Sequence, residues 1–249
     1  MKKLILSLSL LIFAGSLQAQ ENESKADRSS EPGKDLVKIN LLSLPLRNFS
    51  FSYEHHIGKK TTAGLGLRLM PKGGVPMIST ISDMIDDPET SRQLEQLKTS
   101  NFAITPEVRF YLGKEAMRGF YVAPFVRYTK YTASMPFEFD VMGTTQNMPL
   151  SGDLKTFTGG VQLGAQWKLG GKLYLDWWML GPQYGTSKGL LDGKRSLNAQ
   201  EQQALRDELQ DVEIPFADTK TTVDANGARM DISGPWAGLR AGLSLGVRF

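Results

Sequence analysis

The stretch that decides the fold is residues 156–169, TFTGGVQLGAQWKL. From Val161 onward, every second residue is apolar, ending at Leu169, and the residues between are glycine, glutamine or lysine. Successive side chains of a strand point to opposite faces. A period of two therefore predicts a strand with one apolar face and one small or polar face.

The same period recurs in seven further stretches, which predicts an all-β fold. Each is about ten residues long, enough to cross the hydrocarbon layer of a bilayer when the strand is tilted. The seven stretches are residues 36–44, 48–57, 61–69, 101–112, 119–131, 172–184 and 236–249.

The composition of the two faces indicates which one lies outside. In all eight stretches the apolar positions carry no Asp, Glu, Lys or Arg, as expected of a face in lipid, where a midplane Arg or Lys costs about 2–4 kcal/mol. The polar positions are mostly Gly, Ser, Thr and Gln, and small residues suit the narrow interior of an eight-stranded barrel. A soluble, lipocalin-like barrel would instead turn its apolar face inward around a ligand.

The connections alternate in length. Those at 58–60, 113–118 and 170–171 are short, whereas those at 70–100, 132–155 and 185–235 are long. Outer-membrane barrels show this asymmetry between their two ends. We therefore expect an eight-stranded antiparallel transmembrane up-and-down β-barrel, with Pro106 and Pro124 causing a bulge or a local defect in its ladder.

The long loops are expected to contain short helices and to lie outside the cell. Residues 88–97 form one expected helix, with Pro88 at its first position. Residues 198–212 form the other, which Asn198 and Glu201 open as a capping box. Leu205, Leu209 and Val212 would form its apolar stripe.

The first 19 residues have the layout of a secretory signal peptide. Lys2 and Lys3 precede an apolar core over residues 4–15, and cleavage after Ala19 is plausible from the small residues there. Removing two lysines and no acid takes the formal net charge from +3 to +1, which gives no argument for nucleic-acid binding. We expect residues 20–35 to be a flexible periplasmic spacer and 36–249 to be the barrel, in the outer membrane. The absence of cysteine excludes disulfides and a lipid-accepting cysteine.

The inward positions carry charged residues, which we interpret as an ion-paired plug because lone charges in a narrow interior are costly. The alternative is the lining of a selective pore. Lys38 and Arg248 also fall on inward positions. The expected lumen charge cluster consists of Glu54, Arg68, Glu107, Arg109, Arg127, Asp176 and Arg240.

No convincing catalytic or metal-binding set is found. His55 and His56 are the two histidines, and as neighbours in a strand they point to opposite faces. Asp83, Asp86 and Asp87 cluster in a loop but lack the spacing of a calcium loop. We therefore expect no enzyme, no cofactor and no metal.

Aromatic residues are expected to form two girdles at the membrane interfaces. Trp177, Trp178, Tyr184 and Trp236 would belong to the girdle at the long-loop end. Phe110, Tyr111, Phe120, Tyr121, Trp167 and Phe249 would belong to the girdle at the short-turn end.

Two features carry a resemblance to known families. Leu243, Leu245, Val247 and the final Phe249 resemble the terminal strand of outer-membrane barrels, which implies a signal for the barrel-assembly machinery. The stretches VKINLLSLPL (37–46), TPEVRFYLG (105–113) and GFYVAPF (119–125) resemble an uncharacterised family of small outer-membrane barrels from Bacteroidetes-type bacteria. That resemblance covers the strands and implies no known activity.

These observations favour a structural or surface-interaction role. The partners expected are outer-membrane lipid, the barrel-assembly machinery, and a surface or outer-membrane protein held by loops 70–100 and 185–235. A lipid-modifying or proteolytic barrel enzyme using loop carboxylates is one alternative, and a small pore is the other.

Overall fold

The computed structural model describes residues 33–78, 88–210 and 216–249. The expected signal peptide and residues 20–32 of the expected spacer lie outside these ranges, whereas Asp35, the end of that spacer, is the first strand residue. No described helix has the length and apolarity to cross a membrane. The elements are β1 (Asp35–Asn40), β2 (Phe49–Gly58), β3 (Thr61–Gly74), α3 (Pro88–Gln96), β4 (Lys98–Tyr111), β5 (Gly119–Val141), β6 (Thr144–Gly170), β7 (Leu173–Lys194), α4 (Ala199–Gln210), β8 (Asp218–Asp224) and β9 (Gly227–Arg248).

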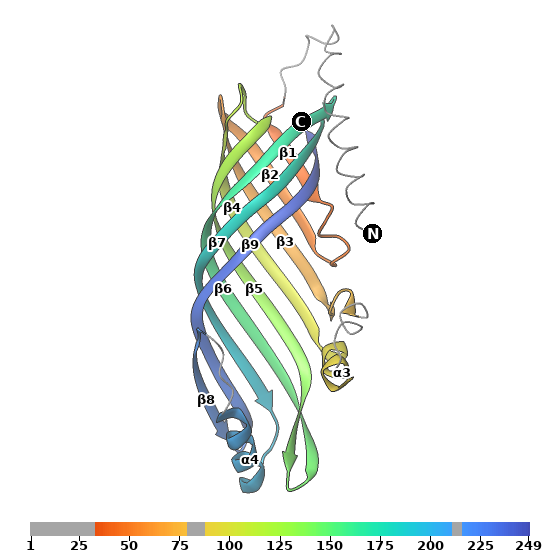
Figure 1. The fold of residues 1–249 in the computed structure, drawn as a ribbon, viewed down its shortest axis with the longest axis vertical. Helices are drawn as coiled ribbons and strands as arrows, with labels where there is room; N and C mark the ends of the chain where they lie inside the picture. Colours follow the sequence, from red (N-terminus) through yellow and green to blue (C-terminus); the bar gives the residue numbers. More distant parts are fainter. Residues whose placement is uncertain (1–32, 79–87, 211–215) are drawn as a thin grey trace. The chain divides into compact units, whose positions relative to one another are not determined.

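Eight of these strands close into a ring. Each pairs antiparallel with its neighbours in the order β1 to β7 and then β9, and β9 pairs back onto β1 (Figure 1). The ring is sealed at its short-turn end by the backbone of Asp35 and Phe249, whose N–H groups each donate to the other's carbonyl, at 3.2 and 2.9 Å. The ninth strand, β8, was not expected; it pairs with β9 alone, outside the ring.

The prediction of long loops at 132–155 and 185–235 is wrong, because strands continue through much of both ranges. β5 and β6 pair from Gly119 as far as Val141 opposite Thr144, and the tight turn between them lies at Met142 and Gly143, both with positive φ. β7 continues to Lys194 and β9 starts at Gly227. β5, β6, β7, β8 and β9 therefore extend beyond β1–β3 at the long-loop end (Figure 1); we call this part the outer extension.

The first strand is shorter than expected and ends at Asn40 instead of residue 44. Beyond it, residues 41–47 turn back on themselves, with Leu44 N–H bonded to Leu41 O and Arg47 N–H bonded to Leu44 O. Arg47 has a φ of 56°, which ends the turn before β2.

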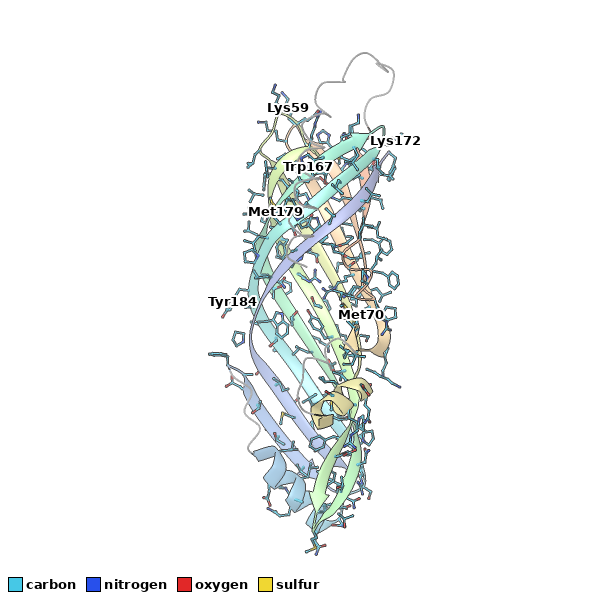
Figure 2. The ribbon with its side chains drawn as sticks, turned by 45° about the vertical axis from the view of Figure 1, so that its right-hand side comes forward. Lys59, Met70, Trp167, Lys172, Met179 and Tyr184 are labelled. Atoms are coloured by element: carbon cyan, nitrogen blue, oxygen red, sulfur yellow. The ribbon has the colours of Figure 1, made fainter. Side chains whose placement is uncertain are left out.

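The ring carries its apolar side chains on the outside, as the alternation predicts. Figure 2 shows side chains projecting from the outer surface, with Lys59 and Lys172 at the short-turn end and Tyr184 partway toward the other end. These exposed side chains form a continuous surface that we call the apolar belt. They include Phe49, Phe51, Leu65, Leu67, Leu69, Phe102, Phe110, Phe120, Val126, Phe157, Val161, Leu163, Trp177, Leu180, Tyr184 and Leu239.

In the outer extension the two faces exchange their polarity. Phe139, Met148 and Ala228 are buried on the inner face and pack against Leu205 of α4, which is fully buried. The outward positions of the same strands carry Lys155, Lys188, Asp192, Lys194, Arg229 and Asp231. The outer extension therefore has its own small core and a charged outer surface.

The helices match their expected positions. α4 begins after Asn198, whose side-chain Oδ1 accepts the backbone N–H groups of Gln200 and Glu201, both at 2.9 Å. Glu201 accepts the N–H of Asn198 at 2.8 Å, which completes the capping box. Leu205 and Leu209 pack as expected, and Val212 lies outside the described residues. α3 is linked to β5 by Arg92 and Glu138 at 3.4 Å.

The two prolines coincide with the expected local defect, but not with a bulge. The ladder between β4 and β5 is interrupted at Pro106 and Pro124, neither of which is paired across it, while its register does not shift there. Instead, β7 has a bulge between Trp178 and Gly181. Because a bulge adds one residue to one strand, the outward positions of β7 change there from odd to even numbers.

Candidate functional site

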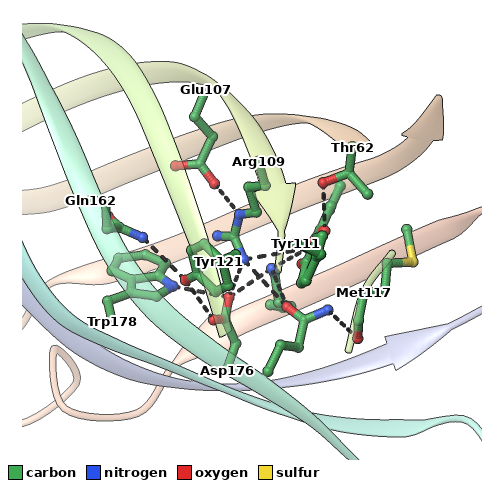
Figure 3. Close-up of polar contacts among 12 residues, drawn as sticks. Thr62, Glu107, Arg109, Tyr111, Met117, Tyr121, Gln162, Asp176 and Trp178 are labelled. Atoms are coloured by element: carbon green, nitrogen blue, oxygen red, sulfur yellow. Dashed lines mark hydrogen bonds and ion pairs between the residues drawn. The ribbon is translucent and has the colours of Figure 1, made fainter. Parts of the chain in front are cut away.

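The interior of the ring near its short-turn end is filled by a connected group of charged and polar side chains (Figure 3). Three carboxylates and two cations form its centre, and each is at most 8% exposed. They come from four strands: β1, β2, β4 and β7. We call this group the plug; its charged members are Lys38, Glu54, Glu107, Arg109 and Asp176.

Asp176 is the hub of the plug. Its Oδ2 accepts from Lys38 Nζ and Arg109 Nη1, both at 2.7 Å, and from the indole N–H of Trp178 at 2.9 Å. Its Oδ1 accepts the hydroxyl of Tyr121 at 2.8 Å. Both oxygens of this buried carboxylate are thus satisfied, as burial of a charge requires.

The two glutamates of the plug are also paired, Glu54 with three donors and Glu107 with one. Glu54 accepts from Lys38 at 2.6 Å, from the Thr62 hydroxyl at 2.7 Å and from the Tyr111 hydroxyl at 2.6 Å. Glu107 accepts from Arg109 Nε at 2.6 Å. Ion pairs and hydroxyl donors together therefore compensate the desolvation of these groups.

Gln166 ties the plug to the short-turn end. Its Oε1 accepts from Lys38 at 3.1 Å and from Arg109 at 3.3 Å. Its Nε2 donates to the carbonyl of Met117, in the connection between β4 and β5, at 3.1 Å. The plug is therefore anchored to a connecting segment as well as to the wall.

Glycines on the inner face provide the space for the plug. A Cβ at Gly164 would lie 2.4 Å from the ring of Tyr121, and one at Gly246 would lie 2.5 Å from Lys38 Cγ. The Arg109 guanidinium in turn lies 4.4 Å from the centre of the Tyr121 ring. The glycine-rich inner positions are thus a steric requirement of the plug.

The expected lumen cluster divides into two groups. Glu54, Glu107, Arg109 and Asp176 meet in the plug. Arg68, Arg127 and Arg240 do not take part in its ion pairs; they lie further along β3, β5 and β9 toward the long-loop end.

Sequence reasoning missed several members of the plug. Lys38 was expected to face inward but not to be central. Tyr111, Tyr121 and Trp178 were assigned to aromatic girdles, which is wrong, because they are 2%, 1% and 6% exposed and bind carboxylates inside the ring. A usable signal exists for two of them, since Tyr111 and Trp178 occupy inward positions two residues from Arg109 and Asp176, whereas Tyr121 has no charged residue at that spacing.

Of the remaining candidate residues, the structure describes the histidines and the end of the chain. His55 Nδ1 lies 2.7 Å from Asp35 at the edge of the ring, and Tyr53 also donates to Asp35. Asp83, Asp86 and Asp87 lie outside the described residues. Within the described ranges no three His, Cys, Asp or Glu residues are arranged to hold a metal ion. Leu243, Leu245, Val247 and Phe249 lie on or just after β9, and their role as an assembly signal stays a prediction.

Comparisons with known proteins give a family and a distant structural likeness. The family described as "Protein of unknown function (DUF3575)" matches residues 8–184. No curated protein matches the chain. Among solved structures, the chain is similar to the translocator domain of the autotransporter NalP from Neisseria meningitidis, with 11% identity, a TM-score of 0.34 and coverage of 98% of this chain and 97% of that one. A likeness this distant assigns no function.

Proposed function

The chain belongs to the DUF3575 family of proteins of unknown function, and we propose that it is a plugged outer-membrane β-barrel that anchors a folded docking platform, the outer extension, at the cell surface. The barrel would supply the anchor and the outer extension the contact with a partner. The proposal has three parts: insertion in the membrane, closure of the interior and docking by the outer extension.

The exchange of polarity along the strands carries the proposal. On β6, the outward residues Phe157, Val161 and Leu163 are apolar, whereas Lys155 on the same face is charged. On β7, the outward residues Leu180 and Tyr184 are followed on the same face by Lys188, Asp192 and Lys194. A belt of roughly ten residues per strand fits the hydrocarbon layer, and an extension with an inner core and a charged exterior fits water.

The plug supports an anchor in preference to a pore. Eight strands enclose little more than their own side chains. Here that space is occupied by the ion pairs of Lys38, Arg109, Glu54 and Asp176, whose side chains are at most 1% exposed. An open conducting path would require these pairs to separate.

The outer extension supports a docking role because it is ordered and carries free backbone edges. β8 pairs only with β9, so the other edge of β8 is unpaired among the described strands. α4 packs between β5 and β8 and turns Gln203, Arg206 and Asp207 outward. An open edge beside a polar helix is a surface to which another protein can add.

The test is affinity capture from native outer membranes with a tagged protein. A variant carrying Gln203→Arg and Asp207→Arg changes the exposed side of α4 and leaves the buried Leu205 in place. We expect wild type to capture a specific partner and this variant to lose it. A control with Lys59→Glu, at the opposite end of the ring, should retain it.

Heat-dependent gel mobility, a property of folded barrels, shows whether each variant still inserts. Loss of the partner with normal mobility supports docking by α4. A partner list identical for wild type and the α4 variant would overturn the docking part. A wild-type protein that is found folded in water without detergent would overturn the anchor.

A further inference from the structure

Three arginines gather on the inner face of the ring, on the long-loop side of the plug. They are Arg68 of β3, Arg127 of β5 and Arg240 of β9. Arg127 is only 6% exposed, and on the inner face of β5 it lies two residues from Phe125, whose ring centre is 4.5 Å from the Arg240 guanidinium carbon. Arg68 lies opposite Ala103 of β4, which in turn lies opposite Thr129, two residues from Arg127 on β5. Like charges brought together in a partly buried place repel one another, so this arrangement needs compensation from something.

No carboxylate of the described chain is bonded to any of the three arginines. None of the three arginines takes part in an ion pair among residues 33–78, 88–210 and 216–249. Glu107 is the carboxylate that acts on Arg240, but it is already bonded to Arg109 at 2.6 Å. Arg127 donates only to the hydroxyls of Thr129 and Thr105, at 3.1 and 3.0 Å.

Two guanidinium nitrogens of the group are buried without a hydrogen-bond partner in the described part of the chain. They are Nε of Arg68 and Nη1 of Arg240. Leaving a buried donor unsatisfied costs about 1–3 kcal/mol, and more when the group is charged. The plug also leaves one guanidinium nitrogen, Nη2 of Arg109, without a partner, but Arg109 is paired with carboxylates, whereas Arg68 and Arg240 form no ion pair among the described residues.

The guanidinium group of Arg240 is held between aromatic rings, and this leaves N–H groups at the edge of its plane free to bond. Its guanidinium carbon lies 4.5 Å from the centre of the Phe125 ring and 5.3 Å from that of Trp178. Gly181 faces it across the pairing with β7, where a Cβ would come within 3.3 Å of Arg240 Cβ. Stacking on aromatic rings fixes the plane of a guanidinium while its N–H groups stay available to a ligand.

We propose that Arg68, Arg127 and Arg240 form a binding site for a phosphate-type oxyanion inside the ring. A tetrahedral oxyanion presents several acceptor oxygens, and the planar fork of N–H donors on arginine matches them with charge-assisted hydrogen bonds. One such ligand would both neutralise the three like charges and satisfy the free nitrogens. The site belongs to the ring and does not depend on what the outer extension docks.

The test is isothermal titration calorimetry of the full-length, detergent-solubilised protein with inorganic phosphate, in a chloride buffer of constant ionic strength. We expect saturable binding at one site. Arg68→Gln with Arg240→Gln should weaken it at least tenfold, and Arg68→Gln alone should weaken it by a smaller factor. Arg229→Gln, at an exposed arginine of the outer extension paired with Asp231, is the matched control and should bind as wild type does.

Trp178 provides a second readout, because its ring lies against Arg240. Its fluorescence should change on phosphate addition in a variant that keeps Trp178 and replaces the other tryptophans with phenylalanine. A parallel titration with glycerol 3-phosphate distinguishes the source: binding of the ester as well as of the free ion indicates a lipid or saccharide phosphate, and binding of the free ion alone indicates inorganic phosphate. Absence of binding by both, or equal binding by the Arg68→Gln/Arg240→Gln protein, would overturn the proposal.

Discussion

Asp176 shows how single residues hold the interior together. It accepts hydrogen bonds from four side chains, two of them cationic, and is fully buried. Its removal would leave Lys38 and Arg109 with Glu54 as their remaining shared counter-ion, and breaking a buried ion pair by removing one partner is strongly destabilising.

We predict that Asp176→Asn lowers the free energy of unfolding by about 3–5 kcal/mol. Reversible urea unfolding in detergent, followed by tryptophan fluorescence, measures the change. Asp192→Asn is the control, because Asp192 forms an exposed pair with Lys194 at 3.3 Å and such pairs contribute only about 0–1 kcal/mol. Equal effects of the two substitutions would contradict the role of the plug.

Gly164 illustrates the steric side of the same interior. We predict that Gly164→Ala costs about 1–3 kcal/mol of stability, because its Cβ would overlap the buried Tyr121 ring and the Trp177 carbonyl. Gly159→Ala, on the same strand, is the matched control, since the nearest atom to its Cβ lies at 3.9 Å. Comparison of the two unfolding midpoints checks this, and a larger loss at Gly159 would show that the space is not needed.

At this scale the sequence indicates which residues face inward but not which of them meet. The alternation placed Glu54, Glu107, Arg109 and Asp176 inside, and they are inside. Their pairing depends on how far each strand is shifted against the next, which brings Lys38 of β1 to Asp176 of β7 across the ring. That shift is set by closure of the whole sheet, so no single strand contains it. For the same reason the sequence alone does not show that Arg68, Arg127 and Arg240 lie outside the plug.

At the scale of elements, the sequence predicts where the strands lie better than it predicts where they end. All eight expected stretches contain or overlap strands of the ring, because each has an apolar outward face. On β5 the expected strand ends at residue 131, where the outward apolar residues end, although the strand continues to Val141. Beyond this point the apolar residues lie on the inner face, as at Phe137 and Phe139. The alternation with apolar residues on the outer face, which predicts the strand up to residue 131, is therefore lost.

The exchange of polarity makes a prediction for β6. Val161→Arg, in the apolar belt, should lower the free energy of unfolding from lipid vesicles by about 2–4 kcal/mol, the cost of an arginine near the bilayer midplane. Asn147→Arg, on the outward face of the same strand in the outer extension, should change it by less than about 0.5 kcal/mol, as exposed substitutions generally do. Urea titration of folded protein in vesicles compares the two. Similar small effects would place both residues in water.

At the scale of the whole molecule, the closed ring and its plug predict electrical silence. Wild-type protein in planar bilayers should show no stepwise conductance, because the buried ion pairs fill the interior at its short-turn end. A protein of the same preparation that folds by gel mobility and still gives regular single-channel steps would contradict closure.

The orientation of the two faces is the claim on which the anchor rests, and two adjacent tryptophans report on it. Trp177 is 47% exposed on the outside of the ring, whereas Trp178 is 6% exposed and donates to Asp176 inside. In vesicles of lipids with brominated acyl chains, a protein that keeps Trp177 as its single tryptophan should lose most of its fluorescence. One that keeps only Trp178 should lose little, and equal quenching of both, or stronger quenching of Trp178, would contradict the account.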